Sequence, residues 1–82
     1  MKINEAVIKR MDYLLKDRGW TTNELVRRSG VHQTTIAEIK AGRTRSPGIS
    51  TIRSIAKGFG MSLAEFFDDD IFDDIDDNSS IK

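Results

Sequence analysis

The feature that most constrains this chain of 82 residues is the segment 21–42, where local signals mark the ends of two short helices. Thr21 and Glu24 have the spacing of a capping box, in which each side chain accepts a hydrogen bond from a backbone N–H group at a helix N-terminus. Trp20 and Leu25 have the spacing of a hydrophobic staple around the same start. The sequence therefore predicts a helix that begins just after Thr21.

A tight turn follows this helix and leads into a second one. Gly30 favours the left-handed backbone conformation that ends helices. His32 is expected to cap the second helix, with Val31 and Ile36 as its staple. Gly42 ends this helix after about eight residues. Two such helices around a short turn form a helix-turn-helix.

The second helix is expected to turn small and hydrogen-bonding side chains to solvent. At about 100° per residue, Ile36 and Ile39 share the inward face. A polar face alone is common on small helical domains, but short side chains also let a helix enter a DNA major groove. Glutamine pairs with adenine there, glutamate accepts from the cytosine amino group, and methyl groups touch thymine. We predict base contacts by four outward residues: Gln33, Thr34, Ala37 and Glu38.

Groups suited to phosphate flank this helix. Lys40, Arg43 and Arg45 lie at or beyond its C-terminal end. The backbone amides at the start of the first helix, near Thr22 and Asn23, are suited to an anion. We predict that these five residues hold DNA phosphates. DNA phosphates repel an uncompensated carboxylate. Glu38 must then either accept a hydrogen bond from a cytosine amino group or turn toward Lys40 or another cation.

The formal charge of zero hides two oppositely charged regions. Residues 1–67 hold 12 Lys or Arg and 6 Asp or Glu, whereas residues 68–82 hold seven aspartates and Lys82. A basic body of net charge +6 suits a polyanionic partner. We therefore predict a helix-turn-helix DNA-binding domain over 1–67 and an acidic tail over 68–82.

Hydrophobic periodicity elsewhere predicts three further helices and no strand. One runs from Asn4, as its cap, to about Asp17, and another spans 49–59. A third begins at Leu63 after a capping box at Ser62. The expected fold class is all-α, a compact five-helix bundle with the helix-turn-helix at its centre.

The acidic tail allows three interpretations. It is a solvated, disordered extension, a short helical extension that docks on a second chain, or a competitor for the basic surface. The aromatic residues before it suit the core, or the core together with a dimer contact. The candidates for contact with a second copy are Phe66, Phe67, Ile71, Phe72 and Ile75.

The composition lacks the residues that several other functional classes require. The chain has no cysteine and one histidine, which leaves no disulfide, no thiol nucleophile and no recognisable catalytic or metal site. We expect no enzyme activity, no cofactor and no small-molecule ligand. No stretch approaches the ~20 apolar residues of a membrane span, and the N-terminus is no signal region. We expect a cytoplasmic protein of a prokaryote or phage.

These motifs resemble the phage repressor and Cro type of helix-turn-helix domain, the xenobiotic-response-element (XRE) family. The likeness covers residues 3–67 and includes TTNEL, SGV, QTTI, AG, RTRSP and IRSIAKGFGMSLAEFF. It implies a lambda-repressor-like fold that binds operator DNA as a two-fold dimer and usually represses transcription. It also places Gln33, Thr34 and Glu38 at bases, and Thr22, Arg43 and Arg45 at phosphates. The chain departs from the common pattern at Leu15, His32 and Ala41.

The sequence therefore predicts a sequence-specific regulator of one domain. Its expected partners are double-stranded DNA and a second copy of itself. The expected regulatory role is that of a repressor. The alternative is an antitoxin-like or adaptor protein whose acidic and hydrophobic tail binds a protein partner.

Overall fold

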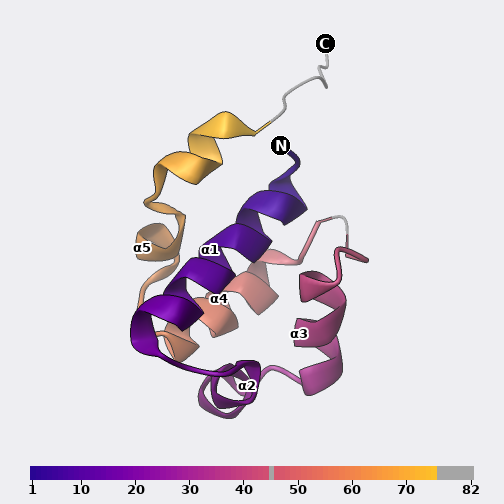
Figure 1. Ribbon diagram of the computed structural model, residues 1–82, viewed down its shortest axis with the longest axis vertical. Coiled ribbons are helices and arrows are strands. Elements are labelled where there is room, and N and C mark those ends of the chain that lie inside the picture. The colour runs from indigo at the N-terminus through magenta and orange to yellow at the C-terminus, as the bar shows by residue number, and fades with distance from the viewer. Residues whose placement is uncertain (45, 76–82) are drawn as a thin grey trace.

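The computed structural model describes residues 1–44 and 46–75, in which every regular element is helical (Figure 1). The elements are α1 (Ile3–Arg18), α2 (Thr22–Ser29), α3 (Gln33–Lys40), α4 (Ile49–Gly58), α5 (Leu63–Phe67) and the 3-10 helix η1 (Asp70–Asp74). Five α-helices and no strand in these ranges confirm the predicted all-α fold.

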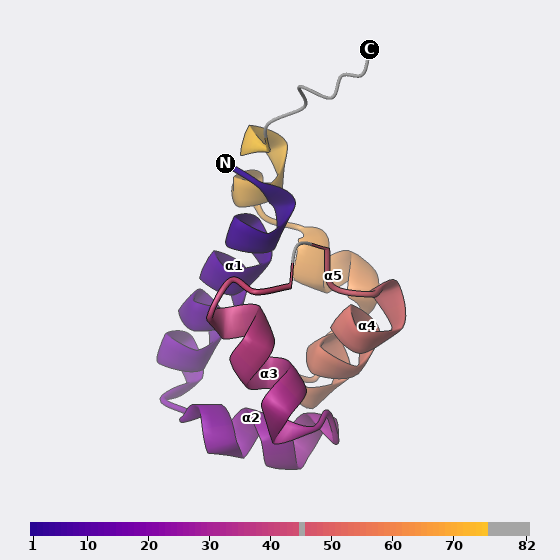
Figure 2. The ribbon, with the colours of Figure 1, turned by 90° about the vertical axis from the view of Figure 1, so that its right-hand side faces the viewer.

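The helices surround a single core. In Figure 1, α1 and α4 occupy the middle, α3 lies on one side of them and α5 on the other, while α2 crosses below. Figure 2 shows α3 at the front of the molecule with no other helix over it. The helix expected to contact bases is therefore at the surface.

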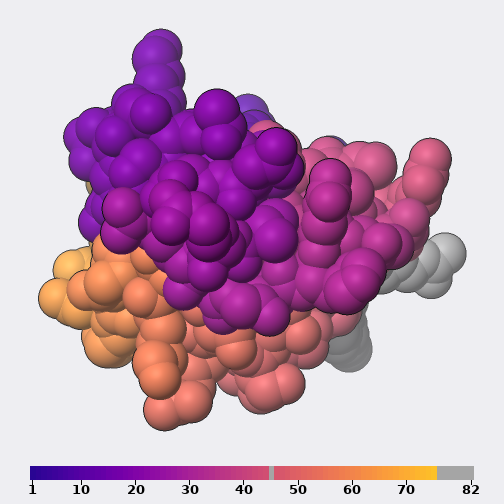
Figure 3. All heavy atoms as spheres, turned by 90° about the horizontal axis from the view of Figure 1, so that it is seen from below, coloured from indigo at the N-terminus to yellow at the C-terminus, as the bar shows by residue number. Residues whose placement is uncertain are grey.

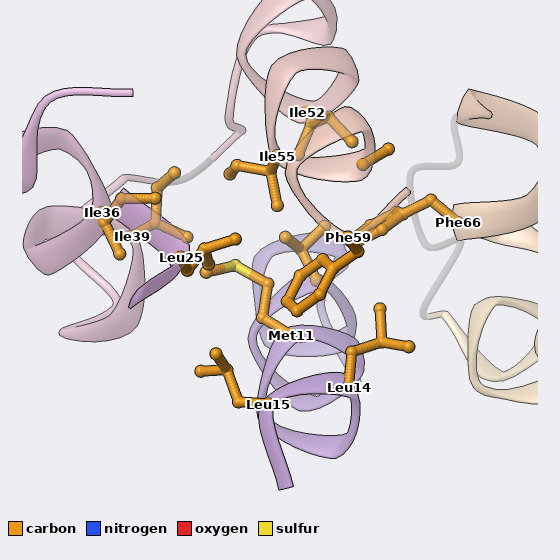
Figure 4. Close-up of a cluster of buried hydrophobic side chains, with 12 residues drawn as sticks. Met11, Leu14, Leu15, Leu25, Ile36, Ile39, Ile52, Ile55, Phe59 and Phe66 are labelled. Carbon is orange, nitrogen blue, oxygen red and sulfur yellow. The ribbon is translucent and has the colours of Figure 1, made fainter. Parts of the chain in front are cut away.

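Apolar side chains from all five α-helices make the core (Figure 4). Ile36 and Ile39 of α3 are 0% and 1% exposed, as their spacing predicts. Burying a side chain of this size contributes about 1.5–3 kcal/mol. This burial fixes the rotation of α3 and thereby decides which of its residues face outward. The remaining core side chains are Val7, Met11, Leu14, Leu15, Leu25, Ile52, Ile55, Ala56, Phe59 and Phe66.

Most helix ends follow the predicted local signals. Thr21 Oγ1 accepts a hydrogen bond from the Glu24 amide at 3.2 Å, which caps α2. Gly30 has φ 74° at the end of α2, in the left-handed region. At α5, Ser62 and Glu65 form both hydrogen bonds of the predicted capping box.

Two predicted details at helix starts are wrong. The first helix begins at Ile3 with Lys2 as its cap, so Asn4 lies inside it. The reason is Glu5, whose carboxylate accepts from the Lys2 amide at 2.8 Å and so satisfies the backbone two residues before Asn4. In α2, Glu24 does not complete a capping box, because its carboxylate pairs with two arginines further along the helix.

A buried arginine joins α1 to the end of the chain that the structure describes. Arg10 donates from Nε to the Phe66 carbonyl at 2.7 Å and from Nη2 to the Glu65 carbonyl at 3.0 Å. Its Nη1 lies 3.2 Å from an oxygen of Asp69. The first part of the predicted acidic tail is thus attached to α1, and residues 76–82 lie outside the described ranges.

The aromatic residues of this end pack on one another. Phe66 is 0% exposed, so the prediction that it contacts a second copy is wrong: it fills the core beneath α5. Phe67 and Phe72 meet edge to face with ring centroids 4.8 Å apart. Phe67, Phe72, Ile71 and Ile75 are each partly exposed.

The close packing of α2 and α4 depends on a glycine. A Cβ atom at Gly58 would lie 2.8 Å from Cβ and 2.9 Å from Cα of Ser29. A side chain at position 58 would therefore force the two helices apart. The contact lies at the C-terminal end of α2, immediately before the turn into α3.

Candidate nucleic-acid interface

The outer face of α3 consists of Gln33, Thr34, Ala37, Glu38 and the following Ala41. All are exposed except Glu38, which is partly exposed. This arrangement follows from the burial of the isoleucines on the opposite side of the helix. The structure thus brings the four predicted base-contacting residues together on one surface.

The turn between α2 and α3 is held by short-range hydrogen bonds. The Val31 amide donates to Ser29 Oγ at 3.1 Å, inside the turn. The Thr34 amide donates to His32 Nδ1 at 3.1 Å, which confirms His32 as the cap of α3. The start of α3, where Gln33 and Thr34 lie, is therefore anchored by its own side-chain cap.

Lys40 connects three helices at one edge of this face. Its Nζ lies 3.2 Å from Thr22 Oγ1 at the start of α2. The same atom lies 3.3 Å from Asp12 Oδ1 on α1. Two predicted phosphate-binding residues, Lys40 and Thr22, are thus in direct contact, and the carboxylate beside them was not anticipated.

Glu38 forms an ion pair at the other edge. Its Oε2 lies 3.1 Å from Arg43 Nη1, in the loop that follows α3. Of the two options that the sequence left open, the structure has the carboxylate turned toward a cation, and this cation is Arg43. The pair joins a predicted base contact to a predicted phosphate contact.

The start of α2 completes the surface around α3. Thr22 and Asn23 form its first turn, where helix amides and the helix dipole favour an anion. Asn23 is exposed and Thr22 partly so. Figure 3 shows the molecule from below, where the surfaces of α2 and α3 adjoin. Arg45, also predicted to bind phosphate, lies outside the described residues.

The arginines of α2 have partners within the fold. Arg27 and Arg28 both pair with Glu24, and the hydrogen bonds from Arg27 and then Arg28 hold the pKa of the Glu24 carboxyl below its ordinary value of 4.5. Arg28 also lies 4.4 Å above the Trp20 ring, which stacks on Phe59 with centroids 5.6 Å apart. These contacts assign Arg28 to packing on Trp20, while Arg27 is held by Glu24 on the surface of α2.

Other types of site find no support in residues 1–44 and 46–75. No three His, Asp or Glu side chains there are placed to hold a metal ion. Within the same residues, no helix has both the length and the apolar character needed to cross a membrane.

The comparison with protein families agrees with this geometry. A family model described as the Cro/C1-type HTH DNA-binding domain matches residues 10–73, which are 64 of the 82 residues. The match includes α2, α3 and the turn between them, and it extends past residue 67, where we predicted the domain to end. The comparison with curated proteins gave no match.

Proposed function

The chain belongs to the Cro/C1-type helix-turn-helix DNA-binding family, and from this premise we propose that it is a sequence-specific transcriptional repressor. In this proposal α3 enters the major groove of a two-fold operator in double-stranded DNA. The observation that carries the proposal is the outer face of α3, which is exposed, lacks large apolar side chains and is held in place by buried isoleucines.

Base recognition is assigned to Gln33, Thr34, Ala37 and Glu38. Gln33 lies in the first turn of α3, the part of a recognition helix that contacts base edges. Its amide suits a bidentate pair with adenine. Glu38 has to leave Arg43 if it is to accept a hydrogen bond from a cytosine amino group. Glu38→Gln is expected to bind more tightly but less selectively if Glu38 makes that contact.

Phosphate binding is assigned to Thr22, Asn23, Lys40 and Arg43, together with Arg45. Thr22 and Asn23 lie at the start of α2, Lys40 is the last residue of α3, and Arg43 lies in the loop after α3. If they neutralise several phosphates, log affinity falls with log salt concentration by about 0.9 per phosphate. Their contacts set the position of the protein on DNA, whereas the outer face of α3 sets the sequence.

We propose that two copies bind half-sites about 34 Å apart. The contact between them is assigned to the end formed by α5 and η1, where Phe67, Ile71 and Ile75 remain partly exposed. Phe72 contributes mainly by packing on Phe67. Sedimentation of the protein with operator DNA tests this assignment, and a single copy per operator would overturn it.

A protein partner for the acidic segment is the weaker candidate. That alternative requires Phe72 to face a second protein, because Ile71 and Ile75 are already assigned to the contact between copies. Phe72 instead has its ring 4.8 Å from that of Phe67 and 6.2 Å from that of Phe66. The repressor hypothesis is therefore preferred, with action on DNA in the cytoplasm of a prokaryotic cell.

Selection of bound sequences from a random DNA pool tests the proposed function. We expect a palindromic site with half-sites one helical turn apart. Enrichment of no sequence, together with equal weak binding to all duplexes, would overturn the proposal. On the selected site, Gln33→Ala should cost about 1–3 kcal/mol of discrimination at one base pair. Arg43→Ala, the matched control, should weaken binding to all sequences alike.

A further inference from the structure

Both cations described at the C-terminal end of α3 are paired with carboxylates of the chain itself. Lys40 Nζ lies 3.3 Å from Asp12 Oδ1, and Arg43 Nη1 lies 3.1 Å from Glu38 Oε2. These are the groups to which the proposed function assigns phosphate contacts. Any DNA phosphate that binds there meets a carboxylate already in place.

The two carboxylates differ in their relation to the outer face of α3. At about 100° per residue, positions 38 and 40 are about 200° apart around the helix. They lie therefore at opposite edges of the outer face. Glu38 belongs to that face itself, whereas Asp12 belongs to α1 and reaches the edge only through Lys40.

We propose that Asp12 competes with the DNA backbone for Lys40 and thereby lowers DNA affinity without changing sequence preference. This inference rests on the proposed function. Asp12 is then a determinant of how strongly the protein binds DNA in general. Such a residue lowers affinity for the operator and for other sequences by the same factor, so the ratio between them is unchanged.

The geometry makes the exchange of partners feasible. The side chains of Lys40 and Asp12 are 31% and 53% exposed, so solvent and phosphate both reach the pair. An ammonium group has three donors, and Thr22 Oγ1 accepts one of them at 3.2 Å. Lys40 therefore keeps an anchor on α2 when the carboxylate is replaced by a phosphate oxygen.

The sign of the effect follows from charge. A carboxylate beside Lys40 repels any phosphate that approaches the same ammonium group. It also neutralises part of the attraction that Lys40 would exert on DNA. Removing this carboxylate improves binding on both counts, while Thr22 continues to orient the lysine. Because the contact is to a phosphate, the improvement is the same for every sequence.

Asp12→Asn tests the proposal, with Asp17→Asn as the matched control. Asp17 lies on the same helix and pairs with a cation outside the proposed interface, Arg18, at 3.7 Å. Binding of the full chain to the selected operator and to a scrambled duplex is measured by fluorescence anisotropy at two salt concentrations. Thermal melting of each variant checks that it is folded.

We expect Asp12→Asn to bind both duplexes about two- to fivefold more tightly, the range typical of one exposed ion pair. The ratio between the two duplexes stays unchanged, and the gain shrinks at higher salt. Asp17→Asn should give a smaller gain. In a Lys40→Gln background, Asp12→Asn should lose its excess over Asp17→Asn, because the competed group is absent.

Three results would overturn the inference while leaving the proposed function intact. The first is an equal gain for Asp12→Asn and Asp17→Asn, and the second is a gain that persists with Lys40→Gln. The third is weaker binding by Asp12→Asn, which would make Asp12 a positioning residue for Lys40. Failure of the unaltered protein to prefer its selected operator over the scrambled duplex would instead overturn the proposed function.

Discussion

Two ion pairs on α1 have nearly the same length but different surroundings. Arg10 lies 3.2 Å from Asp69, and Asp12 lies 3.3 Å from Lys40. The side chains of the first pair are 8% and 34% exposed, whereas those of the second are 53% for Asp12 and 31% for Lys40. Distance alone does not distinguish the pairs, but burial of the cation does.

The remaining hydrogen bonds of the two cations explain what each pair does. Arg10 also donates to the backbone carbonyls of Glu65 and Phe66, which move only if α5 moves. Lys40 donates to one side-chain hydroxyl, that of Thr22, and to no backbone carbonyl among its described contacts. The buried pair therefore maintains the fold, while the exposed pair is available for exchange with a ligand.

The largest effect is expected for Arg10→Met, which tests whether the buried pair maintains the fold. Methionine fills similar space but donates no hydrogen bond, so the Phe66 carbonyl loses Arg10 Nε and the Asp69 carboxylate loses its cation. The Glu65 carbonyl loses one of its two donors and keeps the Asp68 amide. We expect a loss of about 2–4 kcal/mol in the free energy of unfolding. Chemical denaturation followed by circular dichroism measures this loss.

Lys40→Met is the control on the exposed pair. Its loss should lie within about 1 kcal/mol, because exposed ion pairs contribute little to stability. Equal losses for Arg10→Met and Lys40→Met would contradict the distinction between a structural pair and an exchangeable pair.

The contact between Gly58 and Ser29 tests how an uncharged contact contributes to the position of α2. Gly58→Ala places a methyl group 2.8 Å from Ser29 Cβ and 3.0 Å from the Ser29 amide nitrogen. Because backbone atoms are involved, α2 has to shift, and overpacking of this kind costs about 1–3 kcal/mol. The shift also disturbs the turn that leads to α3, so DNA affinity should fall together with the melting temperature.

Gly48→Ala is the control for the glycine substitution. A Cβ at position 48 meets only Thr51 Oγ1, at 4.0 Å, and the φ of −63° suits alanine. Alanine is a poorer helix cap than glycine, so a loss below about 1 kcal/mol is expected. A loss as large as that of Gly58→Ala would show that steric contact with Ser29 is not the cause.

Much of the fold was predictable because its signals are local. Thr21, Gly30 and Ser62 act within a few residues of their own position, and the spacing of the apolar side chains fixes which face of each helix is buried. The start of α1 was misplaced because Glu5 supports Lys2, and a cap of Asn4 looked equally good in sequence.

Arg10 was missed because its partners are 55 to 59 residues away in the chain. A charged residue is ordinarily assigned to solvent. One signal was present, however: Arg10 lies within the buried stripe of α1, three residues after Val7 and one before Met11. An arginine inside an apolar stripe indicates a buried cation with fixed partners.

The candidate interface was predictable only in part, because some of its features are local in sequence and others depend on tertiary packing. The outer face of α3 follows from helical periodicity, so its members were identified from sequence. The partners of its cations were not, because Asp12 meets Lys40 only after α1, α2 and α3 have packed together. A sequence shows which charges exist, but tertiary packing decides which of them meet.

The smallest expected effect concerns Glu24, whose partners Arg27 and Arg28 are exposed cations of the same helix. The hydrogen bonds from Arg27 and Arg28 lower the pKa of this carboxyl from 4.5. A carboxyl with a lowered pKa stabilises the folded state above its unfolded pKa, and this stabilisation disappears as the pH falls through the folded value.

Glu24→Gln should therefore lower the melting temperature slightly near pH 7, and the difference from the unaltered protein should shrink below about pH 4.5, the ordinary value for this group. Asp17→Asn is again the control, since its ion pair is longer at 3.7 Å. A difference for Glu24→Gln that stays constant down to acid pH would show that the Glu24 side chain stabilises the fold through packing and not through its charge. Glu24 would then act as a structural residue, as Arg10 does.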